Sequence, residues 1–233
     1  MTPTLLIPGL AATAALFKEQ IGALNAFGPV HIADHRGAQT MAGLAEIILK
    51  TAPSHFRLCG LSMGGYLAFE ILRQAPERVT HLVLMDTSAR PDTPESSQKR
   101  MDAIDAVKRG GYLRIIKEGI PNLVTEPHSI VPAIRDAIVS MAEDCGPGGY
   151  IDQQMANASR PDSRPLLSSI NVPTLVLVGE QDTLTPEELA TEIALGIGDN
   201  AELEVIAEAG HLTPLEQPVA VRAAIAEFFS ANS

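Results

Sequence analysis

Gly60-Leu61-Ser62-Met63-Gly64 places a serine between two glycines, directly after the apolar run Phe56–Leu61 and before the amphipathic stretch Tyr66–Gln74. The run is typical of a buried strand and the stretch of a helix, so the pentapeptide is predicted to form a sharp turn between them. Such a turn exposes the serine hydroxyl, and the flanking glycines let strand and helix approach. The pattern therefore favours a nucleophilic Ser62 and acyl-transfer chemistry. A glycine-rich turn with a bystander serine is the alternative.

Composition limits the class of protein. The 233-residue chain is 45% hydrophobic and 19% charged, which is enough for one substantial core. Its formal net charge of −11, with no basic cluster, argues against nucleic acid or an anionic membrane surface as a partner. The apolar N-terminus has no positive n-region and is interrupted by Pro8-Gly9, so we interpret it as a core strand rather than a signal peptide. The two cysteines, Cys59 and Cys145, are too few for a disulfide framework, which fits a reducing compartment. We therefore expect a soluble, cytoplasmic protein.

Short apolar runs alternate with helical patterns along most of the chain. Runs rich in Val, Ile and Leu are typical of strands covered on both faces, and the segments between them have the length of crossover helices. The sequence therefore predicts an α/β protein with a doubly wound, mostly parallel sheet. The predicted strands are Thr4–Ile7, Val30–Ala33, Phe56–Leu61, Val79–Met85, Thr174–Val178 and Glu202–Ile206.

The interval between Asp86 and about Pro173 breaks this alternation, because it contains only helical patterns. We predict one domain, residues 1–233, with a helical cap inserted over residues 91–165. Proline and glycine punctuate both ends of the insertion and its middle, which suits a mobile lid; a helical subdomain with only a packing role is the alternative. The predicted cap helices lie near Gln98–Lys108, Gly111–Lys117, Ile130–Ala142 and Tyr150–Ala158.

Two more residues with acid–base chemistry follow predicted strands. A serine nucleophile requires a base, and the base requires a group that orients it. Asp182 follows the fifth predicted strand and His211 the sixth, while Ser62 follows the third. Ligands of open parallel sheets bind outside the carboxyl ends of the strands. We therefore predict Ser62 as nucleophile, His211 as general base and Asp182 as the acid that orients it. Asp86, at the end of the fourth strand, remains an alternative acid.

Two Thr-Pro pairs follow these acid and base residues. Thr185-Pro186 and Thr213-Pro214 each precede glutamate, which is the pattern of an N-cap with proline in the first turn. Each pair is predicted to start a helix. The helix that Thr213-Pro214 starts is predicted to be the final helix of the chain.

The chain order Ser62, Asp182, His211 is the order found in α/β-hydrolases. Through this order and eight local segments the chain resembles the lidded, esterase-like members of that family over nearly its whole length, the cap excepted. The resemblance implies the α/β-hydrolase fold and a serine-based hydrolysis. The matching segments are Ile7-Pro-Gly-Leu10, Asp34-His-Arg-Gly37, Gly60-Leu-Ser-Met-Gly-Gly65, Pro76-Glu-Arg-Val79, Leu82-Val-Leu-Met-Asp-Thr87, Val172-Pro-Thr-Leu175, Gly179-Glu-Gln-Asp182 and Gly210-His211.

The sequence departs from the family pattern in two places. Pro8-Gly9 stands where the family commonly has His-Gly, so this position does not supply the imidazole that often braces the oxyanion loop. The backbone N–H groups of Leu10 and Met63 are still expected to form the oxyanion hole. The two antiparallel strands that often begin the family's sheet have no room before Thr4 and are expected to be missing.

The remaining titratable residues have plainer interpretations. We expect structural or solvated roles for His31, His35, His55, His81 and His128. Asp34 and Arg36 are expected to fix a loop near the site rather than to contact substrate. No pair of His, Cys, Asp or Glu falls at metal-ligand spacing, so no metal site is predicted.

These residues predict the hydrolysis of a small or medium carboxylic ester through an acyl-enzyme on Ser62, with no external cofactor. Two alternatives stay open: a carbon–carbon bond hydrolase or lyase on the same triad, and a ligand-sensing protein with weak turnover. The absence of Trp favours an aliphatic pocket. The natural acyl group and the oligomeric state are left open. The residues expected to line the pocket are Leu113, Ile116, Ile120, Leu123 and Val124.

Overall fold

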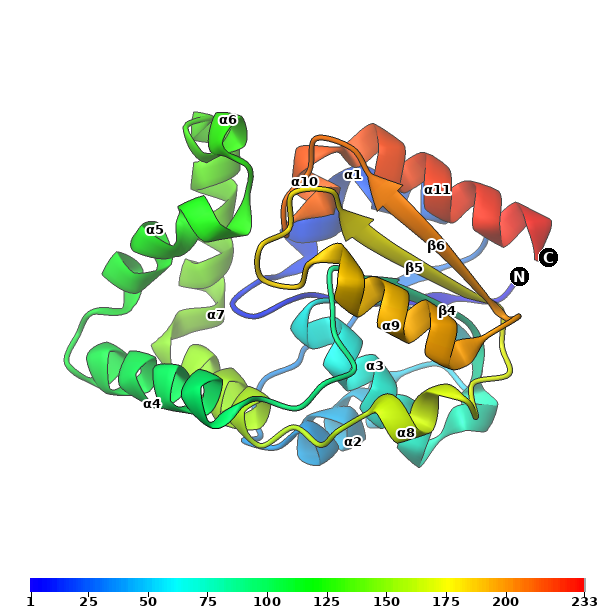
Figure 1. Ribbon diagram of the computed structural model, residues 1–233, viewed down its shortest axis with the longest axis horizontal. Helices are drawn as coiled ribbons and strands as arrows, with labels where there is room; N and C mark the ends of the chain where they lie inside the picture. The colour runs from blue at the N-terminus through cyan, green and yellow to red at the C-terminus, as the bar shows by residue number, and fades with distance from the viewer. Residues whose placement is uncertain (233) are drawn as a thin grey trace.

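The sheet is the centre of the computed structural model, which describes residues 1–232. Its six strands are all parallel, in the order β2-β1-β3-β4-β5-β6. Figure 1 shows β4, β5 and β6 side by side. The predicted parallel α/β sheet is confirmed, and no antiparallel strand precedes β1 among the described residues. The strands are β1 (Thr4–Ile7), β2 (Val30–Ile32), β3 (Phe56–Leu61), β4 (Val79–Met85), β5 (Thr174–Gly179) and β6 (Ala201–Ile206).

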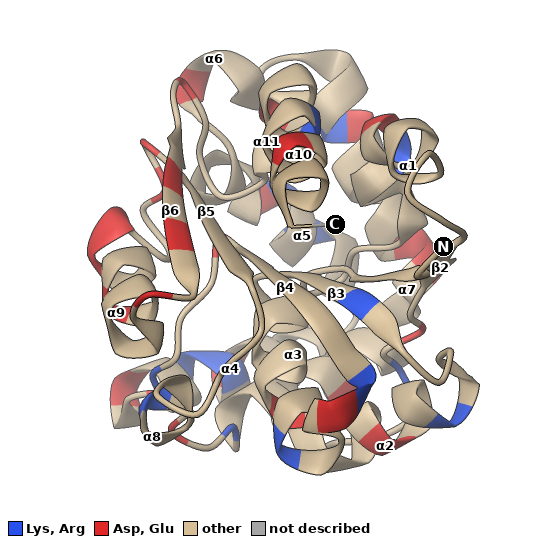
Figure 2. Cartoon of the chain, turned by 90° about the vertical axis from the view of Figure 1, so that its right-hand side faces the viewer, with Lys and Arg blue, Asp and Glu red and all other residues tan. Residues whose placement is uncertain are grey.

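Strand burial follows strand position. Every residue of β3 and β5 is buried, because helices cover both faces of the central strands. β6 lies at one edge of the sheet and carries the exposed Glu202 and Glu204. Figure 2 shows acidic residues on β6 and on the neighbouring helix α9 (Glu187–Ile197). Charges on an exposed edge strand discourage pairing with another chain.

Helices cover the sheet on two faces, as doubly wound sheets require (Figure 1). On one face α2 (Met41–Thr51), α3 (Met63–Gln74) and α9 enclose the core that includes Leu58 and Val176. On the other face α1 (Lys18–Leu24) and α11 (Pro218–Ala231) enclose a second core. Short helices complete the body: η1 (Ala14–Phe17), η2 (Pro76–Arg78), α8 (Arg164–Leu167) and α10 (Thr213–Glu216).

A lobe of four helices lies beside the sheet, opposite the chain ends (Figure 1). It consists of α4 (Pro94–Lys108), α5 (Tyr112–Leu123), α6 (Glu126–Ser129) and α7 (Pro132–Ala158). The sequence predicted two helices where α7 lies. Two helices do lie there: they meet within α7 at a kink at Gly146, whose φ of 72° and ψ of 162° are not helical, and they extend further into the predicted gap than expected.

Three predicted helix starts are wrong. The nucleophile helix starts at Met63 rather than Tyr66. The N-cap of α9 is Pro186, not Thr185. Thr213 is the first residue of the short α10, and the final helix α11 starts separately at Pro218. The Thr185 and Thr213 hydroxyls instead bond the side chains of Asp182 and Asp86.

Among the residues that the structure describes, every helix is too short or too polar to traverse a bilayer.

Candidate active site

The turn between β3 and α3 has the strained geometry that its sequence predicts. Ser62 has φ 54° and ψ −113°, in the left-handed half of conformational space that non-glycine residues rarely adopt. A Cβ added to Gly60 would lie 2.2 Å from the Gly64 carbonyl oxygen, and one on Gly64 would lie 2.0 Å from that of Ile7. Only glycine fits at either position, because any side chain would drive strand and helix apart.

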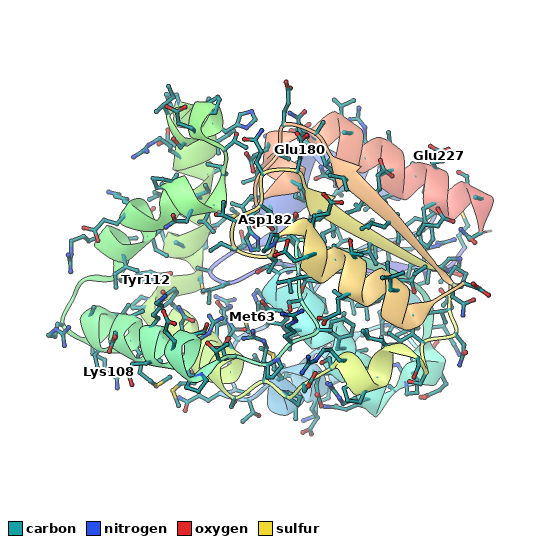
Figure 3. The ribbon with its side chains drawn as sticks, in the orientation of Figure 1. Met63, Lys108, Tyr112, Glu180, Asp182 and Glu227 are labelled. Atoms are coloured by element: carbon teal, nitrogen blue, oxygen red, sulfur yellow. The ribbon has the colours of Figure 1, made fainter. Side chains whose placement is uncertain are left out.

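Three side chains from three loops meet at the carboxyl ends of the strands. The His211 Nε2 atom lies 2.8 Å from Ser62 Oγ, and His211 Nδ1 lies 2.8 Å from Asp182 Oδ2. The loops follow β3, β5 and β6. Figure 3 shows Asp182 on the side of the body that faces the lobe. The structure therefore brings the predicted Ser62, His211 and Asp182 together in one chain of hydrogen-bond contacts.

Hydrogen-bond donors around the Asp182 carboxyl group favour its ionised form. Desolvation would raise the pKa of this buried carboxyl, but hydrogen bonds and the charge of His211 outweigh it and lower the pKa to about 2. Oδ1 accepts from the N–H groups of Leu184 at 2.8 Å and Thr185 at 3.0 Å. Desolvation lowers the pKa of His211, but Asp182 more than offsets this and raises it overall. The pair therefore favours a protonated imidazole during reaction.

The Thr185 hydroxyl contacts both Asp182 and His211 instead of capping α9. It donates to Asp182 Oδ2 at 2.6 Å and lies 3.2 Å from His211 Nδ1. The hydroxyl thus holds the carboxylate oxygen that faces the imidazole.

Asp86, the alternative acid, lies close by but has different partners. Its Oδ1 accepts from Gly179 N–H at 2.9 Å and its Oδ2 from the Thr213 hydroxyl at 2.5 Å. No hydrogen bond joins Asp86 to His211 within residues 1–232. Desolvation of this fully buried carboxyl raises its pKa to about 8, despite the opposing charge of His211. Asp86 is therefore mostly neutral at pH 7, whereas Asp182 is ionised.

Two backbone N–H groups next to Ser62 are free to bind an oxyanion. Within the described chain, neither Leu10 N–H nor Met63 N–H has a hydrogen-bond acceptor. A Cβ built on Gly9 would lie 3.5 Å from Ser62 Cβ, so the loop that carries Leu10 lies against the serine. Met63 begins α3, where the helix dipole favours negative charge.

The loop before Leu10 is braced by an imidazole that comes from elsewhere in the chain. His35 Nε2 lies 3.0 Å from Gly9 O, and burial lowers the pKa of His35 below its ordinary value. The neutral ring therefore donates to this carbonyl. Because Gly9 C=O and Leu10 N–H belong to one planar peptide unit, this hydrogen bond fixes the direction of the Leu10 N–H. His35 supplies the brace that Pro8 cannot.

The lobe fixes the next peptide unit of the same loop. Ala11 N–H donates to Gln153 Oε1 at 2.8 Å, and Gln153 lies on α7 with a fully buried side chain. Its Nε2 reaches His35 O at 3.4 Å. Sequence reasoning missed both braces, because no local motif marks a pairing between residues 26 or 142 positions apart.

The lobe also holds the loop that carries His211. Glu216 accepts hydrogen bonds from Gly210 N–H at 2.9 Å and from Thr125 N–H at 2.7 Å, and its Oε2 lies 3.0 Å from His128 Nδ1. His211 N–H and Leu212 N–H both donate to Leu123 O at 3.1 Å. Lobe and body thus share the positioning of His211.

Asp34 and Arg36 pair with each other at 2.7 Å near the surface. Arg36 also donates to Asp144 O of α7 at 3.1 Å. Neither residue lines the cavity beside Ser62.

A cavity of about 690 Å³ lies above the Ser62 hydroxyl, between body and lobe. Its size is that of a small-molecule site. One part of the wall is apolar and another carries polar and charged side chains. The apolar residues include Leu10, Ile115, Ile116, Leu123, Ile138, Met141 and Ala142; the polar ones include Arg90, Asp92, Lys99, Arg100, Gln154, Asn157 and Arg160.

The predicted lining is only partly right. Ile116 and Leu123 line the cavity, but Leu113, Ile120 and Val124 do not. Ile116, Ile120 and Leu123 lie on one face of α5. Ile120 is fully buried in the core, whereas Ile116 and Leu123 are only partly buried against it and keep surface at the cavity. The wall is also less aliphatic than expected, because Tyr66 and Tyr150 belong to it.

Comparison with known proteins agrees with the fold. The model of the alpha/beta hydrolase family matches residues 5–224, so the chain belongs to this family. A thermophilic esterase from Thermogutta terrifontis, solved with malate bound, is 33% identical, with a TM-score of 0.91 over 100% of this chain and 91% of that one.

Curated relatives are more distant in sequence. A pimeloyl-[acyl-carrier protein] methyl ester esterase from Neisseria meningitidis is 25% identical, covering 96% of this chain and 91% of the relative. The 3-oxoadipate enol-lactonase 2 of Acinetobacter baylyi is 27% identical, covering 85% and 70%. This protein is therefore an α/β-hydrolase with relatives among enzymes that cleave carboxylic esters.

Proposed function

We propose that this protein is a carboxylesterase that cleaves small or medium esters through an acyl-enzyme on Ser62. The observation that carries the proposal is the continuous hydrogen-bonded arrangement of Ser62, His211 and Asp182, of which Ser62 and His211 line the cavity. The esterase and enol-lactonase relatives support the same reaction class, because lactones are cyclic esters. We also propose that α4–α7 act as the cap of the site.

The mechanism begins with proton transfer from Ser62 to His211 Nε2 as the serine oxygen attacks the ester carbonyl carbon. Asp182 holds the imidazole in the correct tautomer and offsets its charge. Leu10 N–H and Met63 N–H stabilise the oxyanion of the tetrahedral intermediate. His211 then protonates the leaving alcohol, and the acyl-enzyme forms.

Water completes the cycle. His211 removes a proton from water as the water oxygen attacks the acyl carbon, and a second tetrahedral intermediate uses the same oxyanion hole. Collapse of this intermediate breaks the bond to Ser62 Oγ and returns the proton to it. The carboxylic acid product leaves, and no external group is consumed.

The function is tested by offering purified protein three kinds of substrate. We expect it to release p-nitrophenol from short p-nitrophenyl esters, with an initial burst if deacylation is the slower step. Turnover confined to a vinylogous diketone or a cyclohexadiene acid would instead favour the carbon–carbon alternative. Ligand binding without turnover of any of these compounds would favour the sensor.

His35→Ala is expected to lower kcat for a p-nitrophenyl ester by about 10- to 100-fold, with little change in KM. Without the imidazole the Gly9–Leu10 peptide can rotate, so the oxyanion hole loses part of a donor, and loss of a whole donor costs on the order of 100-fold or more. Steady-state kinetics measures the effect. The matched control is His81→Ala, because His81 lies near the amino end of β4, away from the carboxyl ends of the strands, and its Nε2 lies 2.7 Å from Asn232 O. Equal kcat values for the two variants would contradict the role of His35.

A further inference from the structure

Two arginines surround one buried carboxylate in the cavity wall. Asp92, with a side chain 2% exposed, accepts a hydrogen bond from Arg100 Nε at 2.6 Å and another from Arg160 Nη1. The Arg100 and Arg160 side chains are themselves 21% and 9% exposed. Because a guanidinium stays protonated in proteins, the cluster holds two positive charges against one negative charge. The cluster therefore has a net positive charge, although the formal net charge of the whole chain is −11.

The cluster keeps hydrogen-bond donors that no protein group uses. Arg160 donates from Nε to Arg90 O at 3.0 Å and from Nη1 to Asn157 O at 3.1 Å, but its Nη2 has no acceptor within residues 1–232. This Nη2 is not sealed inside the protein. Arg100 Nη1 donates to Gln154 Oε1 at 2.7 Å, which leaves a second N–H on that nitrogen. Free donors of a net cation therefore border the cavity.

The other cations of the cavity wall are already neutralised. Arg90 pairs with Glu192 at 2.9 Å and Lys99 with Glu95 at 2.8 Å, and Arg90 and Lys99 are themselves half or more exposed. Among the residues described as lining the cavity, Asp92 is the one carboxylate. The unpaired charge is therefore that of the Arg100–Asp92–Arg160 cluster.

The cluster lies within reach of a substrate held at Ser62. Tyr66 follows Ser62 by one helical turn, about 6 Å along the axis of α3. The Arg160 guanidinium carbon lies 4.3 Å from the centre of the Tyr66 ring, and both residues line the cavity. Apolar side chains such as Ile116 and Met141 complete the same wall. One molecule can therefore place a carbonyl at the serine and an anionic group at the arginines, with methylenes between.

We propose that the Arg100–Asp92–Arg160 cluster binds a carboxylate, and that the preferred substrates are monoesters of aliphatic dicarboxylic acids. The ester carbonyl would lie at Ser62 and the free carboxylate at the unused guanidinium N–H groups. A guanidinium fork matches a carboxylate, and a monoanion neutralises the net charge of the cluster. This substrate class rests on the proposed esterase function.

The cluster also joins the two chain segments that connect body and lobe, since Asp92 lies before α4 and Arg160 after α7. A purely structural cluster would make its variants lose activity towards all esters in proportion. The ratio of kcat/KM for an anionic ester to that for its neutral counterpart separates the two roles, because loss of folded protein cancels in the ratio.

The test compares monomethyl glutarate, adipate and suberate with methyl pentanoate, hexanoate and octanoate, in a pH-stat. We expect the wild type to prefer at least one anionic ester by about tenfold or more, as charge-assisted hydrogen bonds allow. Arg100→Gln should bring the ratio close to one. Asp92→Asn should raise it, because it removes the competing negative charge. The matched control is Arg114→Gln, which removes a charge from an exposed ion pair of the lobe with Glu118; its ratio should equal that of the wild type.

Each outcome decides one part of the proposal. A ratio near one in the wild type, with neutral esters hydrolysed, would overturn the carboxylate subsite and leave the esterase function intact. Proportional losses on both ester series in Arg100→Gln and Asp92→Asn would also overturn it. If neither ester series nor any p-nitrophenyl ester is hydrolysed, the esterase function fails first.

Discussion

Ser62→Ala is expected to lower kcat for p-nitrophenyl butyrate by roughly 10,000-fold or more, to a residual rate set by binding and the oxyanion hole. The substitution removes the Ser62 Oγ atom, which lies 2.8 Å from His211 Nε2. Within residues 1–232 no other hydroxyl makes a hydrogen bond to that nitrogen, so no second nucleophile is in place. Alanine keeps the small side chain that the elbow tolerates. Steady-state hydrolysis measures the loss, and circular dichroism checks that the variant is folded. Retained turnover in a folded variant would rule out Ser62 as nucleophile.

Asp182→Asn is expected to lower kcat by about 10,000-fold, because an amide stabilises the wrong imidazole tautomer and cannot offset the imidazolium charge. Asp86→Asn is the matched control, with the same change on a neighbouring buried carboxyl. Its effect at pH 7 should be small, since the raised pKa of Asp86, about 8, already keeps that side chain neutral. A larger loss in Asp86→Asn than in Asp182→Asn would show that Asp86, and not Asp182, orients His211.

The pH dependence of kcat/KM tests the interaction of His211 with Asp182 independently. His211 accepts a proton only when it is neutral, so kcat/KM falls as pH drops through its raised pKa. Desolvation still lowers this pKa in Asp182→Asn, while the substitution removes the strongest of the effects that raise it and leaves only the weaker charges of Asp86 and Glu216. The acid limb of the residual activity should therefore move to lower pH.

Much of the fold could be predicted because the informative signals are local. The apolar run, the glycines and the serine of residues 56–64 specify a strand, a close approach and a helix start within nine consecutive positions. Asp182 and His211 could be placed together with Ser62 because parallel strands bring their carboxyl ends to one edge.

Two of the wrong helix starts arise where a threonine hydroxyl bonds a buried carboxyl group instead of capping a helix, over 3 positions for Thr185 and 127 for Thr213. Thr185 and Thr213 carry a capping pattern, yet their hydroxyls bond the carboxyl groups of Asp182 and Asp86. Such bonds between buried groups outweigh a cap that water could replace. His35 acts on a loop 26 positions away, and Asp92 binds an arginine 68 positions away. Local patterns do not encode pairings at these separations.

The most direct measurement of the central claim is mass spectrometry of the protein quenched during turnover of a p-nitrophenyl ester. We expect one acyl group per chain, on the peptide that contains Ser62, appearing with the burst of p-nitrophenol and decaying as substrate is exhausted. The adduct should be absent in Ser62→Ala. An acyl group on a different residue, formed at the rate of turnover, would contradict the acyl-enzyme mechanism proposed for this protein.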